Sequence, residues 1–197
     1  WPRWVAASAA MPASVRRSVS RPASSKQRCS SPPASRSSST GSWLGQPALR
    51  WMARERVAVV NVSLVGPDNV ALSRTIEAML ARGHLIVAAA GNDGPAAPPR
   101  FPAAYPGVIA VAAVDARGTL LPESAVGAHI DACADGVIDV RTRTRGTSFA
   151  APIVARALAG AWAVPAPGRS AEASRVLARV ARPARTPRCG LGIVPPA

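Results

Sequence analysis

Apolar and polar positions follow two different periods along residues 57–114. Residues 57–64 are mostly apolar and rich in β-branched side chains, a pattern typical of a strand buried on both faces. Shorter apolar runs over residues 85–90 and 108–114 predict two further strands. A strand, a helix and a strand in this order predict a βαβ unit and therefore a parallel sheet. The helix is predicted from one apolar stripe between the first two strands, formed by Leu72, Ile76, Met79 and Leu80.

Polar residues and glycines mark the ends of the predicted helices. Asp68 and Asn69 are suited to cap the first helix, and Gly83 suits the left-handed conformation that ends it. A second helix is predicted directly after Ser148, and it stays apolar on nearly all sides as far as Trp162. Because a helix without a polar face packs inside a protein, this one is expected to be buried.

The first 48 residues differ in composition from the rest of the chain. Their arginines are scattered among Ser, Pro and Ala, and no sustained strand or helix period is present. The net charge of +14 is concentrated at the two ends of the 197-residue chain. Residues 1–56 carry 10 basic and 1 acidic side chains, residues 57–140 carry 4 and 8, and residues 141–197 carry 10 and 1. The length favours one domain with a mildly acidic core.

A candidate nucleophile lies in residues 146–152, which read Gly-Thr-Ser-Phe-Ala-Ala-Pro. Gly146 allows the backbone to turn sharply and to approach a substrate closely. Ser148 then falls at the start of an apolar helix, where backbone N–H groups and the helix dipole favour negative charge. Pro152 is expected in the first turn, where its missing N–H is tolerated. The alternative is that this segment is an ordinary helix N-cap.

A second candidate segment is residues 87–94, where an apolar run ends in Gly-Asn-Asp-Gly. This pattern predicts a buried strand that opens into a turn at its carboxyl end, which is where sites form in parallel α/β sheets. The side chain of Asn92 could donate a hydrogen bond to an oxyanion there. The alternative is that Asn92 and Gly94 only form the turn.

Together, the two segments resemble the subtilisin-like serine peptidases, or subtilases. In that family, Ala-Ala-Gly-Asn supplies the asparagine of the oxyanion hole, and Gly-Thr-Ser-x-Ala-x-Pro carries the nucleophile. Residues 59–67 are similar to the family segment beside the primary specificity pocket, and residues 101–111 to the segment that leads into the next core strand. Residues 188–192 are similar to the closing pattern of the domain. The resemblance runs from about residue 49 to residue 194.

The resemblance implies an α/β fold with three layers, αβα, around a mostly parallel sheet, of which residues 49–197 form a partial catalytic domain. It implies a secreted or periplasmic serine endopeptidase that cleaves peptides or proteins through an acyl-enzyme, without a cofactor. Ser148 is implied as the nucleophile and Asn92 as the side-chain oxyanion donor. No acidic loop has calcium-ligand spacing, so no metal site is expected. The implied substrate-binding residues, whose apolar character favours hydrophobic substrate side chains, are Ser63, Leu64, Val65, Gly66, Ala90 and Gly91.

The other two members of a catalytic triad are not found in the sequence. A nucleophilic serine needs a base within hydrogen-bond reach and a carboxylate that orients the base. The family histidine is followed by Gly-Thr, whereas His84 is followed by Leu and His129 by Ile, and no Asp precedes residue 68. His84 also precedes its strand, at the opposite end from Asn92. The alternative function is an inactive remnant that acts at most as a peptide-binding or interaction module.

The cysteines and the longest apolar runs indicate no further class of site. Cys29, Cys133 and Cys189 are odd in number and widely spaced, so buried free thiols or incidental residues are expected rather than disulfides or a metal site. No apolar run reaches the ~20 residues of a membrane span, and no signal peptide is expected at the N-terminus. The sequence carries no pattern that indicates an oligomeric state.

Residues 1–48 allow three interpretations. They could be a disordered basic arm that binds nucleic acid or acidic surfaces, a linker or processed leader, or a product of translation in the wrong reading frame. The arm lacks a named binding motif and aromatic residues interleaved with its charges, so nucleic acid is not an expected partner. The abrupt start of family-like sequence in the middle of a domain favours the wrong-frame interpretation.

We therefore predict that another reading frame, upstream of the codon for Leu49, encodes an aspartate-bearing strand and a His-Gly-Thr motif. Sequencing the gene with its upstream DNA and translating all three frames tests this prediction. If no frame contains both features, the chain is a truncated or degenerate family member, and hydrolysis should not be assigned to it.

Overall fold

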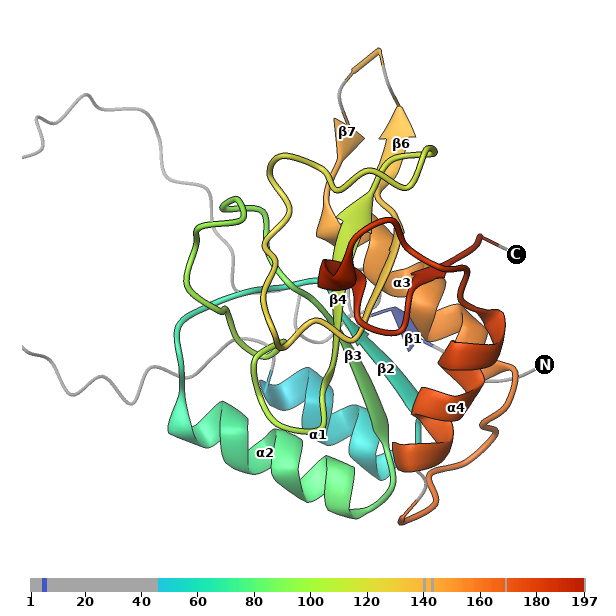
Figure 1. Cartoon of the computed structure of the whole chain (residues 1–197). Coiled ribbons are helices and arrows are strands. Elements are labelled where there is room, and N and C mark those ends of the chain that lie inside the picture. Colours follow the sequence, from blue (N-terminus) through green and yellow to red (C-terminus); the bar gives the residue numbers. More distant parts are fainter. Residues whose placement is uncertain (1–4, 7–45, 140, 143, 169, 197) are drawn as a thin grey trace, which may run out of the picture.

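A six-stranded sheet forms the middle of the protein, as a computed structural model shows (Figure 1). The structure describes residues 5–6, 46–139, 141–142, 144–168 and 170–196. All neighbouring strands of this sheet run parallel, which confirms the predicted α/β class. In spatial order the strands are β1 (Val5–Ala6), β2 (Val59–Val62), β3 (Leu85–Ala89), β4 (Ile109–Val114), β5 (Ala132–Asp135) and β8 (Ile193–Val194).

The central strands are buried on both faces, as their continuous apolar character predicts. Successive side chains of a strand point to opposite faces, so Val60 packs into one core cluster and Val59 into the other. In the sheet, Val59 lies opposite Leu85 of the neighbouring strand, and Val111 lies opposite Ala132. The three predicted strands are therefore present, each trimmed at its ends relative to the apolar run.

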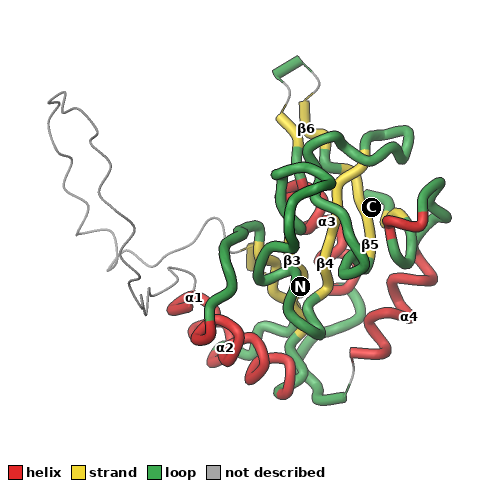
Figure 2. The backbone as a smooth tube through the Cα atoms, turned by 60° about the vertical axis from the view of Figure 1, so that its left-hand side comes forward, coloured by secondary structure: helices red, strands yellow, loops and turns green. Residues whose placement is uncertain are grey.

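Two pairs of helices cover the two faces of the sheet (Figure 2). The first core cluster joins the sheet to one pair of helices, and the second cluster joins it to the other pair. This arrangement confirms the three-layer αβα architecture. The first pair is α1 (Gln46–Arg54) and α2 (Val70–Ala81), and the second pair is α3 (Thr147–Ala159) and α4 (Ser170–Val180).

Helix α2 begins and ends where its sequence predicts. The Asn69 side chain accepts a hydrogen bond from the Leu72 N–H, which caps the first turn. Gly83 follows the helix with a φ of 85°, and a Cβ on it would lie 2.1 Å from the carbonyl carbon of Ala166. Only glycine meets both the conformational and the steric demand at that position.

Helix α3 is the buried helix that the sequence predicts. Most of its side chains are inaccessible to solvent, and Trp162 beyond its end is only 2% exposed. The helix packs along β2, β3, β4 and β5. Two short antiparallel strands, β6 (Val137–Asp139) and β7 (Thr144–Arg145), form a hairpin that leads from the sheet into α3.

The segment 1–48, predicted to be foreign to the fold, contributes strand β1 and the first three residues of α1. Strand β1 pairs with β2 through Val5 and Val60 and through Ala6 and Asn61. The other residues of segment 1–48, apart from 46–48 at the start of α1, lie outside the described part of the chain, so its assignment stays a prediction. Within the described residues, no helix has the length and apolar character that a membrane span requires.

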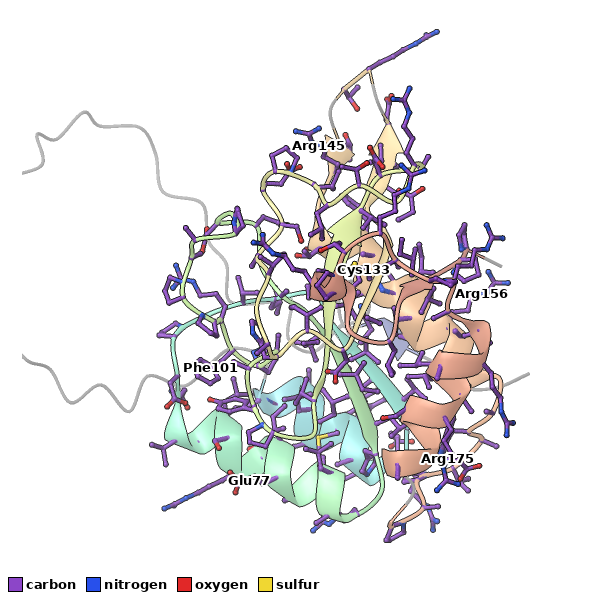
Figure 3. The ribbon with its side chains drawn as sticks, in the orientation of Figure 1. Glu77, Phe101, Cys133, Arg145, Arg156 and Arg175 are labelled. Carbon is purple, nitrogen blue, oxygen red and sulfur yellow. A yellow bond between two sulfur atoms is a disulfide. The ribbon has the colours of Figure 1, made fainter. Side chains whose placement is uncertain are left out.

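The expectation of free thiols at Cys133 and Cys189 is wrong, because the two residues form a disulfide bond (Figure 3). Cys133 lies in β5, and Cys189 ends the short 3-10 helix η2 (Pro187–Cys189) that precedes β8. Both residues are fully buried, with their Cα atoms 5.1 Å apart. The sequence separation of 56 gave no signal, because the pairing of β5 with β8 brings the two residues together. Cys29 lies outside the described residues.

Replacing Cys133 with Ser should lower the free energy of unfolding by about 4 kcal/mol, because the bond closes a long loop in the unfolded chain. Urea denaturation with and without a reductant measures the change. Reduction should lower the stability of the native chain by a similar amount and leave the Cys133→Ser variant unaffected. Titration of three free thiols in the folded, unreduced chain would contradict the bond.

Candidate active site

The predicted site residues lie where β2 and β3 leave the sheet at its carboxyl edge. Residues 63–66 follow β2, and residues 90–92 follow β3 directly. The start of α3 contacts both segments through hydrogen bonds. Since parallel strands end at the same edge, this is the edge at which α/β proteins build their sites. The structure therefore brings Ser63, Gly91, Asn92 and Ser148 together.

Asn92 is held by the residue that precedes the candidate nucleophile. Its Oδ1 accepts hydrogen bonds from the N–H of Thr147 at 2.9 Å and from Oγ1 of Thr147 at 3.1 Å. Oγ1 of Thr147 in turn accepts the N–H of Gly91 at 3.2 Å. With Oδ1 engaged, the amide orientation is fixed. Among the described residues Nδ2 of Asn92 has no acceptor, so its two hydrogens are available to a ligand.

Ser148 lies in the first turn of α3, but Pro152 does not. Since α3 begins at Thr147, Pro152 lies in the second turn and inside the helix, which corrects the expected position. A residue there would normally donate its N–H to the carbonyl of Ser148, and proline has none. The Ser148 carbonyl instead accepts a hydrogen bond from Oγ of Ser63 at 3.1 Å.

Asn61 extends this connection into the sheet. Nδ2 of Asn61 donates to Oγ of Ser63 at 3.0 Å, which orients the hydroxyl toward Ser148. Asn61 is only 8% exposed although it stands within an apolar strand. The sequence analysis assigned no role to Asn61. The one feature that could have indicated a role is its polar amide, which stands among the apolar residues Val59, Val60 and Val62.

The alternative that Ser148 is only a helix cap does not hold. The N-cap of α3 is Gly146, with a φ of 150° and no side-chain hydrogen bond. Ser148 lies two residues further on and is half-buried. Asn92 likewise does more than form a turn, because its side chain bonds Thr147 across 55 residues of sequence.

The remaining predicted substrate-binding residues differ in their exposure to solvent. Leu64 and Val65 are 52% and 42% exposed. Gly66 exchanges two backbone hydrogen bonds with Phe101. Ala90 is fully buried, and its N–H donates to the carbonyl of Val111, so its side chain belongs to the sheet interior.

Neither histidine of the chain lies at the edge that carries Ser148. His84 directly precedes β3, and its buried ring lies 2.7 Å from the carbonyl of Val57. His129 precedes β5, and burial lowers the pKa of its imidazole against a smaller opposing effect from Asp131. Both positions are at the amino edge of the parallel sheet. Neither histidine is therefore placed to act as a base for Ser148.

The described residues were compared with the side-chain groups that hold a metal ion in proteins. Across the described ranges, no three His, Cys, Asp or Glu side chains gather closely enough to hold a metal ion. The arrangement offers a hydroxyl at a helix start, an oriented amide donor and a fixed backbone. These groups can bind and polarise a carbonyl.

Comparison with known proteins places these features in a family. The sequence model described as the subtilase family of peptidases matches residues 27–192. Subtilisin DY from Bacillus licheniformis is 36% identical over 135 residues, which are 62% of this chain and 49% of that protein. Subtilisin NAT from Bacillus subtilis subsp. natto is 34% identical over 136 residues, 64% of this chain and 35% of that protein. The chain thus spans half or less of these relatives.

A solved structure shows the same fold. The self-cleaved protease domain of PatA superimposes with a TM-score of 0.63 at 26% sequence identity. The superposition covers 76% of this chain and 63% of that one. The structural similarity therefore covers only part of the PatA protease domain.

Substitution of Gly146 by Ala should disturb the Asn92 amide. The new Cβ would lie 3.0–3.2 Å from three atoms of Asn92, and the φ of 150° is strained for any residue with a Cβ. We expect a loss of about 1–3 kcal/mol in the free energy of unfolding, measured by urea denaturation.

Gly160→Ala is the matched control for this substitution. Gly160 has ordinary helical angles, and a Cβ added to it would meet no atom of another residue within 4 Å. Alanine there should leave the stability unchanged or raise it slightly. Equal denaturation midpoints for the two variants would show that Gly146 is not constrained by Asn92.

Proposed function

Because the chain belongs to the subtilase family, we propose that it acts as a serine endopeptidase with Ser148 as its nucleophile. The observation that carries the proposal is the pairing of Ser148, at the start of α3, with the oriented and unoccupied amide donor of Asn92. Its substrates are peptides or proteins. The activity also needs a base and a carboxylate, and neither Ser148 nor Asn92 supplies them.

In the proposed reaction, Oγ of Ser148 attacks the carbonyl carbon of a peptide bond while a base takes the hydroxyl proton. The carbonyl oxygen becomes an oxyanion. The tetrahedral intermediate then expels the amine, which receives the proton from the base, and leaves an acyl group on Ser148. Water, deprotonated by the same base, attacks this ester and releases the acid.

Two donors are available for the oxyanion. One is Nδ2 of Asn92, and the other is the N–H of Ser148, which lies in the first helical turn and lacks an intrahelical acceptor. Thr147 holds the Asn92 amide through two hydrogen bonds before a substrate arrives. A donor that is already oriented costs no reorganisation when charge develops, and this makes it effective.

The peptide would lie against residues 63–66 and the backbone of Ala90 and Gly91. The exposed side chains of Leu64 and Val65 supply apolar contact. Oγ of Ser63 is already bonded to the Ser148 carbonyl, so its contribution is to the position of the nucleophile. The proposal therefore assigns binding to Leu64, Val65 and Gly91, and positioning to Ser63.

A fluorophosphonate probe tests the nucleophile directly. It should label the folded chain at Ser148, and labelling should be lost in Ser148→Ala and unchanged in Ser73→Ala, a half-buried serine on α2. Free imidazole should accelerate labelling, because it supplies the base that His84 and His129 cannot. Asn92→Ala should slow the imidazole-assisted reaction by about 10²–10³-fold.

Mass spectrometry of the labelled peptide and the time course of labelling give these results. Absence of labelling in a folded sample, with and without imidazole, would overturn the proposal that this serine is a competent nucleophile.

A further inference from the structure

A groove between α1 and α2 is lined by four arginines and by no acidic residue of the described chain. The two helices lie side by side on one face of the sheet (Figure 2). The groove has a volume of about 620 Å³, which is the size of a small-molecule site. Its arginines are Arg50 and Arg54 of α1, Arg74 of α2 and Arg82 directly after α2, and all four are exposed.

Small side chains keep this groove open. Ala53 of α1 and Ala71 and Ala78 of α2 line it, and none of them has an atom beyond Cβ to fill the space between the arginines. Val70, which begins α2, also lines the groove and is 66% exposed. The groove therefore combines an apolar lining with charged groups on long, flexible stems.

The spacing of the arginines suits a ligand with several anionic groups in a row. Arg50 and Arg54 lie one helical turn apart, a spacing at which like charges repel and destabilise a helix. Arg74, Ala78 and Arg82 share one face over two turns, so the Cα atoms of the two arginines lie about 12 Å apart. A single small anion would not reach both, whereas a chain of anions would relieve the repulsion along the groove.

The chain itself offers these arginines no neutralising partner among the described residues. Arg100 is paired with Asp93, but no ion pair joins any arginine of the groove to an acid there. Glu77, the acid of α2, accepts a hydrogen bond from Oγ of Ser73 at 2.7 Å and does not line the groove. The sequence of residues 1–45 contains no Asp or Glu. The neutralising anion would therefore come from outside the chain.

Acidic residues around the groove restrict the class of ligand. Glu55, Asp68 and Glu77 are exposed on the same helices or in the segment between them. A broad anionic surface, such as a membrane or an acidic protein, would meet these carboxylates together with the arginines, whereas a small ligand inside the groove would not. The planar guanidinium group binds phosphate through two parallel hydrogen bonds, and each phosphate group offers several acceptor oxygens.

We infer that the groove binds an oligophosphate, which is a short chain of linked phosphate groups, either free or carried on a small organic group. The arginines would bind the phosphates, and the apolar lining would contact an organic group where one is present. The inference does not involve Ser148. Its outcome is therefore independent of the proposed peptidase activity, for which fluorophosphonate labelling is a separate measurement.

Isothermal titration calorimetry of the full chain, near 0.15 M salt, tests the inference. The probes are tripolyphosphate, adenosine triphosphate and a glutamate pentapeptide of about the same charge. Both phosphate probes should bind with a stoichiometry of about one and more tightly than the pentapeptide, because carboxylates offer fewer acceptor oxygens per group. Tighter binding of adenosine triphosphate would identify a ligand with an organic group, and tighter binding of tripolyphosphate would identify a free oligophosphate.

Two double variants locate the binding in the groove. Arg50→Gln with Arg54→Gln, and Arg74→Gln with Arg82→Gln, should each weaken the binding of tripolyphosphate about tenfold or more, because each removes two charge-assisted contacts. Thermal melts without ligand check that each variant folds.

Arg175→Gln with Arg179→Gln is the matched control. These two arginines are also exposed and one turn apart, but they lie on α4, which covers the other face of the sheet. The control removes the same charge from a chain of net charge +14, so it measures the general attraction of an anion to the protein. It should weaken binding less than about twofold, as expected for exposed charges outside the groove.

Ala78→Glu separates binding from folding. The substitution places a carboxylate one turn from both Arg74 and Arg82, where it neutralises them and occupies the groove. Binding of tripolyphosphate should fall about tenfold or more. The melting temperature should not fall, because glutamate and arginine at this spacing support a helix.

Four results would overturn the inference. They are the absence of binding by both phosphate probes, equal affinity for the pentapeptide, an equal loss of affinity in the α4 control, and native affinity in Ala78→Glu.

Discussion

The hydrogen bond from Ser63 to the Ser148 carbonyl links the end of β2 to the start of α3 across 85 residues of sequence. It can form because Pro152, one turn further along the helix, has no N–H to occupy that carbonyl. A second link, from Thr147 to Asn92, ties the same helical turn to the end of β3. Two neighbouring strands thus fix one turn of a buried helix, and Ser63, Gly91 and Asn92 are all bonded to that turn.

Much of this arrangement could be predicted from local patterns. The cap at Asn69, the stripe of α2 and the turn at Gly83 are encoded within a few residues, and the structure follows them. The start of α3 was placed near Ser148 for the same reason. The roles of Pro152 and Asn61 were not predicted, since each depends on a partner from another element. The Cys133–Cys189 bond was missed on the same grounds, because it depends on the pairing of β5 with β8.

The division between the two edges of the sheet separates both histidines from Ser148. In a parallel sheet, a residue that directly precedes a strand lies at the amino edge, and one that directly follows a strand lies at the carboxyl edge. His84 and His129 precede strands, whereas Asn92 follows one. No rotamer change moves a side chain across the length of a strand. The fold therefore holds the proposed nucleophile and oxyanion donor at one edge of the sheet and both histidines at the other.

The position of the disulfide has a consequence for how the chain would survive cleavage. Cys133 and Cys189 bracket the β6–β7 hairpin and the whole of α3, and the hairpin carries the exposed Arg141 and Thr142. A single nick between those two residues would leave both fragments covalently joined. The strand pairs and the buried helix would hold the fragments in register. Ser148 would then stay attached to its sheet after the exposed loop had been cut.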